Sequence, residues 1–249
     1  MPFFQKDKDV RLHYRDEGAG FPLFVIYGGG LNSAVSYPAG PFDVFEEFRS
    51  EYRCISMDLR NSPVGQSTGP LDAALAWDAF TGDQLALLDH LGVKQFFVIG
   101  FCIGNPLIWN LQKHAPGRIV AAVSAQPSGV DPKDPMFLSR NNLTKWAPEF
   151  MAKRPDVSKE AVESFLERMY RGKDFVLTVS RDFVRNCQTP LLVLPDDVPA
   201  HPLAVSLEMP RLAPNGQQSL YPWKDTSENV KLAVRHVRTF YKAHRPAGV

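Results

Sequence analysis

Short apolar runs alternate with longer helical patterns along most of the chain. Four runs, at residues 22–27, 96–99, 119–125 and 189–194, are apolar at nearly every position. Runs of this length and composition are typical of strands that lie inside a sheet with both faces covered. Between them, residues 73–91, 106–114 and 230–240 place apolar side chains at helical spacing. Strands and helices in this order predict a mostly parallel sheet with helices on both faces, an α/β fold.

Weaker patterns complete the expected sheet and its covering helices. Residues 10–16 alternate apolar and polar side chains, which predicts a half-buried strand near an edge of the sheet. The remaining elements are expected at residues 42–49 (helix), 52–58 (strand), 202–212 (helix) and 217–220 (strand).

The interval from residue 127 to 189 differs from the rest of the chain. It contains no convincing central strand, but helical patterns occur at residues 143–152 and 158–171. Its larger apolar side chains are Trp146, Phe150, Phe165, Met169, Tyr170 and Phe175. We therefore expect a core made of residues 1–126 and 190–249 and a helical insertion at 127–189, whose apolar side chains either line a pocket or pack on the sheet.

The segment 96–105, FFVIGFCIGN, carries the most specific signal. A buried-strand run leads into Gly100-Phe101-Cys102-Ile103-Gly104, and a helical pattern begins directly afterwards. A sharp strand-to-helix turn needs residues without side chains two positions before and after its centre, and both glycines meet that need. Cys102 then lies at a helix N-terminus, which favours a reactive thiolate, although most free cysteines are small buried apolar residues.

This G-x-C-x-G turn resembles the nucleophile elbow of the α/β-hydrolase superfamily, in the cysteine variant of dienelactone hydrolases. The resemblance implies an α/β-hydrolase fold with a cap over the site at 127–189. The resemblance also extends to Tyr27-Gly28-Gly29-Gly30, which looks like the family's oxyanion-hole motif with Tyr in place of His. The N–H groups of Gly29 and Ile103 are then expected to form the oxyanion hole, unless the glycines only make a turn.

The segment after residue 57 also resembles the family. Asp58-Leu59-Arg60 and the following residues are similar to its D-x-R-G-x-G-x-S segment, and we expect a structural role, with Asp58 and Arg60 paired inside the loop. His13 is expected to lie on its strand without a chemical function.

The loop after the strand at 189–194 is where the family places its triad acid. It contains Asp196 and Asp197, of which we predict Asp197 as the acid and Asp196 as the alternative, although adjacent carboxylates are also common in solvated turns and helix caps. The family's catalytic histidine follows the last strand, but residues 221–227 contain none. Only His201 lies in a loop expected to face Cys102, so it is predicted as the base, with a role in capping the next helix as the other interpretation.

Composition excludes several classes of protein. The 249 residues carry a formal net charge of only +1, which gives no basic surface for nucleic acid or an anionic membrane. Three cysteines without paired spacing argue against disulfides and a zinc site and fit a reducing compartment. We expect a cytoplasmic protein with a small-molecule substrate and neither cofactor nor metal, and the sequence leaves a homodimer open.

The sequence thus predicts a hydrolase or acyl-transfer enzyme for a small neutral or anionic ester, lactone or thioester. Cys102 is the predicted nucleophile, with His201 and Asp197 as base and acid. The missing histidine keeps a second hypothesis open, a non-catalytic protein that binds a small ligand on the same fold. A third, a lyase or isomerase acting on a C–C bond, has precedent in the fold but is selected by no residue.

Overall fold

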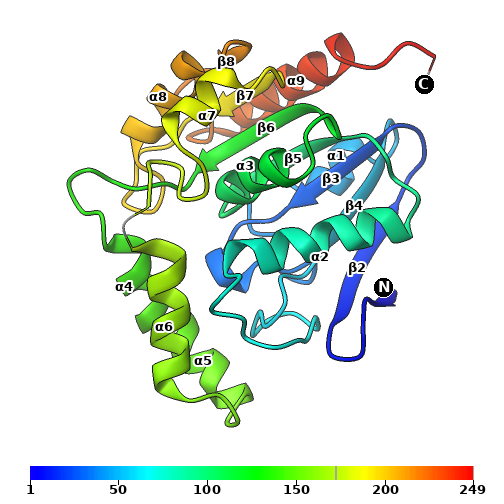
Figure 1. Cartoon of the computed structure of the whole chain (residues 1–249). Helices are drawn as coiled ribbons and strands as arrows, with labels where there is room; N and C mark the ends of the chain where they lie inside the picture. Colours follow the sequence, from blue (N-terminus) through cyan, green and yellow to red (C-terminus); the bar gives the residue numbers. More distant parts are fainter. Residues whose placement is uncertain (172, 249) are drawn as a thin grey trace.

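A computed structural model describes residues 1–171 and 173–248 of the chain (Figure 1). In these residues an eight-stranded sheet has the order β1-β2-β4-β3-β5-β6-β7-β8. The strands are β1 (Phe3–Gln5), β2 (Arg11–Glu17), β3 (Pro22–Ile26), β4 (Arg53–Met57), β5 (Phe96–Cys102), β6 (Ile119–Pro127), β7 (Leu191–Leu194) and β8 (Gly216–Gln218). From β4 to β8 in this order all neighbours pair in parallel, whereas β2 pairs antiparallel with both β1 and β4. The predicted mostly parallel sheet is confirmed.

The helices lie in two layers and one separate group. They are α1 (Val44–Phe48), α2 (Trp77–His90), α3 (Gly104–His114), α4 (Phe137–Thr144), α5 (Trp146–Lys153), α6 (Lys159–Tyr170), α7 (Arg181–Asn186), α8 (Leu203–Leu212) and α9 (Ser227–Ala243). Helices α2, α3 and α8 bury apolar side chains in the core on one face of the sheet. Helices α1 and α9 do so on the other face.

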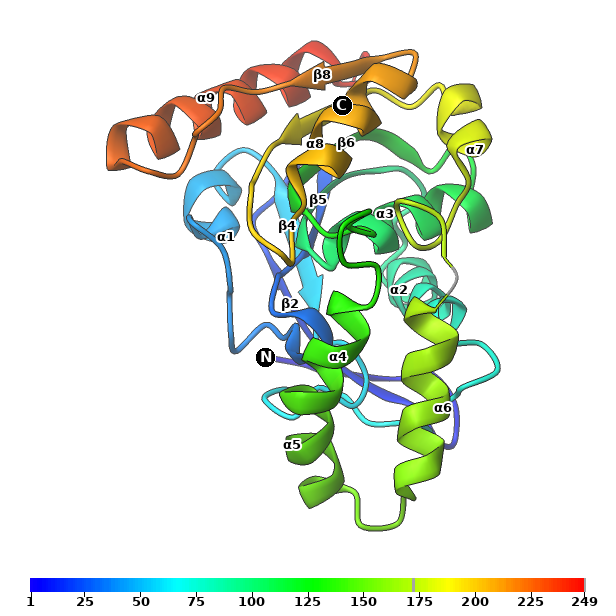
Figure 2. The ribbon, with the colours of Figure 1, turned by 90° about the vertical axis from the view of Figure 1, so that its left-hand side faces the viewer.

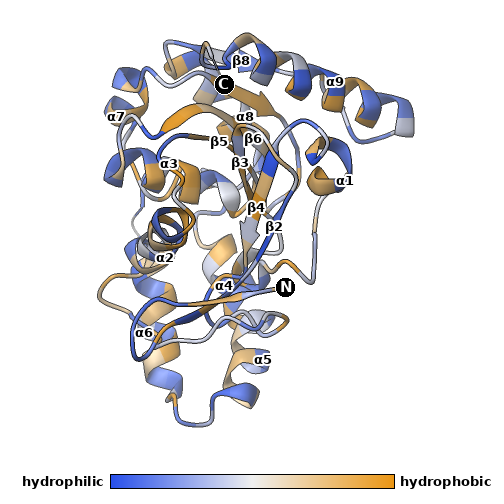
Figure 3. Ribbon diagram, turned by 90° about the vertical axis from the view of Figure 1, so that its right-hand side faces the viewer, coloured by the Kyte–Doolittle hydropathy of each residue, from blue (hydrophilic) through white to orange (hydrophobic). Residues whose placement is uncertain are grey.

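Alternation along the central strands explains why both faces are covered. In β5, Phe96 and Val98 belong to one core, whereas Phe97, Ile99 and Phe101 belong to the other. Because successive side chains of a strand point to opposite faces, a run that is apolar throughout needs cover on both sides. Figure 3 shows the result, with hydrophobic strands in the middle and hydrophilic outer faces on the helices.

Helices α4, α5 and α6 project from the sheet as a group of their own (Figures 1 and 2). The sequence predicted one helix at 143–152, but α4 ends at Thr144 and α5 begins at Trp146. Pro148 explains the break, because it has no N–H to donate to the carbonyl of Thr144 and fits only the first turn of a new helix. The assignment of residues 127–189 to a cap remains a prediction.

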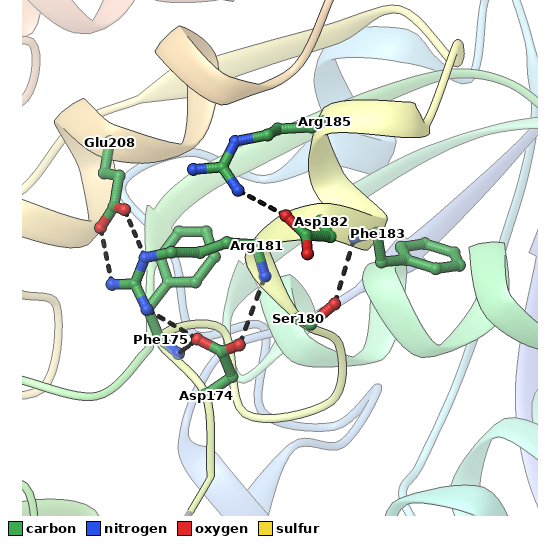
Figure 4. Close-up of polar contacts among 8 residues, drawn as sticks. All are labelled: Asp174, Phe175, Ser180, Arg181, Asp182, Phe183, Arg185 and Glu208. Atoms are coloured by element: carbon green, nitrogen blue, oxygen red, sulfur yellow. Dashed lines mark hydrogen bonds and ion pairs between the residues drawn. The ribbon is translucent and has the colours of Figure 1, made fainter.

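Helix α7 is fastened to α8 by a charged cluster (Figure 4). The Arg181 guanidinium donates through Nε and Nη2 to the two carboxylate oxygens of Glu208, at 2.5 and 3.0 Å, and through Nη1 to Asp174 at 2.8 Å. Bidentate pairing fixes the orientation of a guanidinium as well as its distance. The chain that returns from the insertion to β7 is thereby attached to the helix that follows the β7 loop.

The predicted pairing of Asp58 with Arg60 is wrong. Asp58 is buried and accepts hydrogen bonds from His13 and from backbone N–H groups of Val35 and Gln66. Arg60 instead makes a bidentate pair with Asp83 of α2. The backbone donors of the loop already occupy the Asp58 carboxylate, so the guanidinium finds its partner on the neighbouring helix. His13 has the structural role that was expected.

The turn from β5 into α3 leaves no room for added atoms at its first glycine. A Cβ at Gly100 would lie 2.8 Å from the Gly104 Cα and 2.9 Å from its carbonyl carbon. We expect Gly100→Ala to lower the free energy of unfolding by about 1–3 kcal/mol, the usual cost of overpacking, in urea denaturation.

Gly82, inside α2, provides the matched control. An added Cβ there meets only the flexible end of Lys6, at 3.7 Å. Gly82→Ala should raise stability by up to about 1 kcal/mol, because alanine is the better helix former. Equal effects of the two substitutions would contradict the steric argument.

Candidate active site

Cys102 lies at the corner between β5 and α3. Its backbone adopts the left-handed conformation, with φ of 55°, which non-glycine residues rarely occupy. The corner directs the residue toward the N-terminal end of α3, and Cys102 lines a cavity of about 560 Å³. Such backbone strain is typical of residues held in place for function.

The surroundings of Cys102 stabilise a thiolate. Its Sγ lies 3.2 Å from the Ser128 Oγ. Burial raises the pKa of the Cys102 thiol. Interaction with His201 and hydrogen bonds from the Ser128 hydroxyl and the Gly30 N–H have a larger, opposite effect, and the pKa is lowered to about 7. By contrast, burial raises the pKa of Cys54 to about 12. Cys102 and Cys54 therefore differ in their environments, and Cys102 has that of a reactive cysteine.

His201 is placed by a tight turn in the loop after β7. Val198 and His201 exchange backbone hydrogen bonds, which folds the chain back before Pro202 opens α8. The ring Nδ1 lies 2.8 Å from the Asp196 Oδ2. Burial lowers the pKa of His201, but Asp196 and the Cys102 sulfur raise it to about 9. The lowered pKa of Cys102 and the raised pKa of His201 together favour a thiolate beside an imidazolium at neutral pH.

The structure pairs His201 with Asp196 and not with Asp197. Asp196 is 4% exposed, whereas the Asp197 side chain is exposed to solvent. Burial raises the pKa of Asp196, but hydrogen bonds from His201 and Lys224 lower it to about 2. The preference for Asp197 in the sequence analysis is therefore replaced by its alternative, because the chain turns between the two residues and only Asp196 faces the ring.

The glycine loop after β3 lines the cavity opposite His201. Gly29 and Gly30 both have positive φ, at 96° and 60°, and both border the cavity together with Ile103. The backbone N–H of Gly30 hydrogen-bonds to the Cys102 sulfur and lowers the pKa of the thiol. Gly30 is one residue beyond Gly29, the donor predicted from the sequence. The role of Gly29 and Ile103 as an oxyanion hole remains a prediction.

The α4–α6 group contributes to the wall of the cavity. Its contributions to the wall include Leu138, Asn142, Trp146 and Tyr170. All six apolar residues are buried in one core cluster: Trp146, Phe150, Phe165, Met169, Tyr170 and Phe175. Trp146 and Tyr170 also line the cavity, so both interpretations apply to these two residues.

Several residues of the site were not found from the sequence. Ser128 directly follows β6, and Gln126 and Lys224 form a polar link to Asp196. For Lys224 a signal existed, since it lies in the loop after the last strand, where the resemblance noted from the sequence leads one to expect a histidine. Ser128 had no local signal beyond its place at the end of a strand.

The other histidines lie apart from Cys102 in structural pairs. His114 contacts Asp78 at 2.8 Å, and His236 contacts Ser219 at 3.0 Å. In the described part of the chain no cluster of three or more His, Cys, Asp or Glu side chains could hold a metal ion. None of the described helices is long and apolar enough to cross a membrane.

Comparison with known families agrees with this architecture. Residues 22–187 match the family model described as alpha/beta hydrolase fold. The chain is 30% identical over 121 residues to 2-hydroxymuconate semialdehyde hydrolase of Pseudomonas sp. (strain CF600), a match covering 49% of this chain and 41% of that protein. It is 29% identical over 120 residues to Epoxide hydrolase 4 of Mus musculus, covering 47% of this chain and 32% of that protein. The match thus spans less than half the length of these relatives.

Solved structures extend the similarity to nearly the whole chain. The enol-lactonase from Burkholderia xenovorans LB400 superposes with a TM-score of 0.69 at 18% identity, over 97% of this chain and 100% of that one. The meta-cleavage product hydrolase (CumD) from Pseudomonas fluorescens IP01 superposes with a TM-score of 0.67 at 18% identity, over 94% and 95% of the two chains. At such identities the likeness establishes a shared fold.

The environment of Cys102 predicts selective alkylation. With iodoacetamide at pH 7, Cys102 should react before Cys54 and Cys187, as mapped by mass spectrometry, because the pKa of the Cys102 thiol is lowered to about 7. His201→Ala should slow the reaction about tenfold at pH 7 and little at pH 10, since it returns the thiol toward an ordinary pKa. Faster labelling of Cys187, or no effect of His201→Ala, would contradict the assignment.

Proposed function

Because the chain belongs to the α/β hydrolase fold family, we propose that it is a hydrolase or acyl-transfer enzyme that uses Cys102 as its nucleophile. The observation that carries the proposal is that Cys102 and His201 line the same cavity and shift each other's pKa, while Asp196 contacts the His201 ring from behind. The substrate class is a small ester, lactone or thioester. The G-x-C-x-G turn supports the further likeness to dienelactone hydrolases.

The first half of the reaction forms a thioester. The Cys102 thiolate attacks the carbonyl carbon, and the negative charge that develops on the carbonyl oxygen is stabilised by N–H groups of Ile103 and of the glycine loop, Gly29 or Gly30. When the intermediate collapses, the bond to the leaving group breaks and the His201 imidazolium supplies its proton. The products of this half are an acylated Cys102, a neutral His201 and a free alcohol or thiol.

The second half restores the enzyme. Neutral His201 takes a proton from water, or from an acceptor alcohol in acyl transfer, and the oxygen attacks the thioester carbonyl. The acyl–sulfur bond breaks and the acid or the new ester leaves. Asp196 keeps the histidine in one orientation and stabilises its protonated form throughout.

The cavity favours a neutral substrate over an anionic one. Apart from His201, the charged side chains that line it in the described chain are Lys145 and Glu149, and both are exposed at its rim. A carboxylate taken into the interior would need a buried cationic partner to offset its desolvation. Trp77, Trp146 and Leu177 instead present apolar surface. An uncharged acyl group that fills about 560 Å³ fits this wall best.

Residues 127–189 act as a cap in this proposal. Helices α4–α6 contribute much of the cavity wall, so they exclude bulk water from Cys102. Exclusion of water strengthens the attraction between the thiolate and the imidazolium.

Turnover of neutral activated esters tests the proposal. In a p-nitrophenyl ester series, Cys102→Ala should abolish the burst of p-nitrophenol, and His201→Ala should lower kcat/KM by about 10²–10⁴-fold. Asp196→Asn should lower it strongly, because the histidine loses its charged partner, whereas Asp197→Asn should have little effect. Equal effects of the two Asp variants would contradict the role given to Asp196.

The pH profile provides a second test. Activity should fall as the pH drops through about 7, because the thiol of Cys102 becomes protonated. It should fall again above about 9, because His201 loses the proton that the leaving group needs. Ligand binding without turnover by the wild-type protein would instead support a non-catalytic binding protein.

A further inference from the structure

Lys224 contacts the acid of the site from the loop that follows the last strand. We infer that Lys224 is a positioning residue, which holds the Asp196 carboxylate and limits how tightly His201 keeps its proton. The inference rests on the proposed function, because it assigns a regulating role within the same site. No feature of the family motifs in the sequence assigns this lysine a function.

Two cationic groups share one carboxylate oxygen. The Lys224 Nζ lies 2.5 Å from the Asp196 Oδ2, and the His201 Nδ1 lies 2.8 Å from the same atom. A carboxylate oxygen can accept from both. Because the ammonium neutralises part of the charge that would otherwise attract the imidazolium, the two cations compete for Asp196.

The position of Lys224 is fixed from both sides. The preceding residue, Trp223, is fully buried and donates through Nε1 to the Pro195 carbonyl at 2.7 Å, which attaches this loop to the β7 loop. On the other side, the Lys224 Nζ donates to the Gln126 Oε1 at 3.2 Å. Gln126 itself has a positive φ of 42°, a strained conformation at the end of β6. The Lys224 side chain is consequently only 31% exposed, less than a freely solvated lysine.

The other charged groups near Lys224 are acidic. Asp225 follows it in the chain, and Asp197 follows Asp196, both exposed to solvent. Desolvation raises the pKa of Tyr221, and the negative charges of Asp197, Asp196 and Asp225 raise it further. The Ser206 hydroxyl of α8, which is neutral, accepts a hydrogen bond from the Asp196 backbone N–H. Cys102 interacts with His201. Besides His201, the cation that contacts Asp196 in the described residues is Lys224.

The sign of the effect follows from these contacts. If the Lys224 charge is removed and Asp196 stays ionised, the carboxylate attracts the His201 imidazolium more strongly. The midpoint of the His201 titration should therefore move to higher pH. We expect a shift of roughly 0.5–1 unit, because Lys224 is itself partly open to solvent, which screens its charge. With a higher midpoint, a smaller fraction of His201 is in the neutral form that can accept a proton from water at a given pH.

NMR titration of the histidine rings tests this inference without a substrate. The His201 signal is assigned by its loss in His201→Gln. Lys224→Met and Lys224→Gln should both raise the His201 midpoint, and Lys224→Arg should restore the wild-type value. Lys231→Met is the matched control, because Lys231 is exposed on α9 and has no ion pair in the described residues. It makes the same change in net charge without touching Asp196.

Two results would overturn the inference. An unchanged or lower His201 midpoint in both Lys224→Met and Lys224→Gln, with reduced thermal stability, would mean that the lysine only fastens a loop. The same shift in Lys231→Met would mean that net charge and not contact is responsible. A wild-type midpoint near the ordinary value would count against the proposed thiolate–imidazolium pair, and the shift between variants would still measure the role of Lys224.

Discussion

The sharp turn between β5 and α3 is the constraint around which the cavity is arranged. Cys102 can occupy its left-handed conformation only because Gly100 and Gly104 come into direct contact across the turn. With that contact in place, the sulfur faces the ends of β3, β6 and β7, from which the glycine loop, Ser128 and His201 approach. The carboxyl ends of parallel strands meet at one edge, so one turn brings together residues that are far apart in sequence.

The proposed base and the proposed acid come from one short loop in this chain. Asp196 and His201 are five residues apart, and the turn between Val198 and His201 makes their contact local. The histidine therefore does not depend on the last strand for its position. The loop after β8 is left to supply a lysine to the acid. On the proposed assignment, the β7 loop supplies both His201 and Asp196, and the loop after β8, which has no histidine at residues 221–227, supplies Lys224.

Much of the architecture followed from local patterns, but the site followed only in part. The central strands could be predicted because they are apolar throughout, and the turn at Cys102 could be predicted because glycines flank it at the required spacing. Asp196 and Asp197 have the same chemistry, and only the path of the loop decides which one is buried. Arg60 likewise could not be paired from sequence, because its partner Asp83 lies on a separate helix. Contacts between elements depend on packing that no local pattern records.

The charges at the site form a nearly neutral group. In the thiolate–imidazolium state, Cys102 and Asp196 carry negative charge, and His201 and Lys224 carry positive charge, in an alternating series. A buried charge without a partner is costly, so each member stabilises its neighbour in the ionised form. Lys224 is the one most open to solvent, and its charge is thus the most easily screened or removed. In our proposal Lys224, the most exposed of the four, therefore influences the protonation of Cys102 and His201 through Asp196.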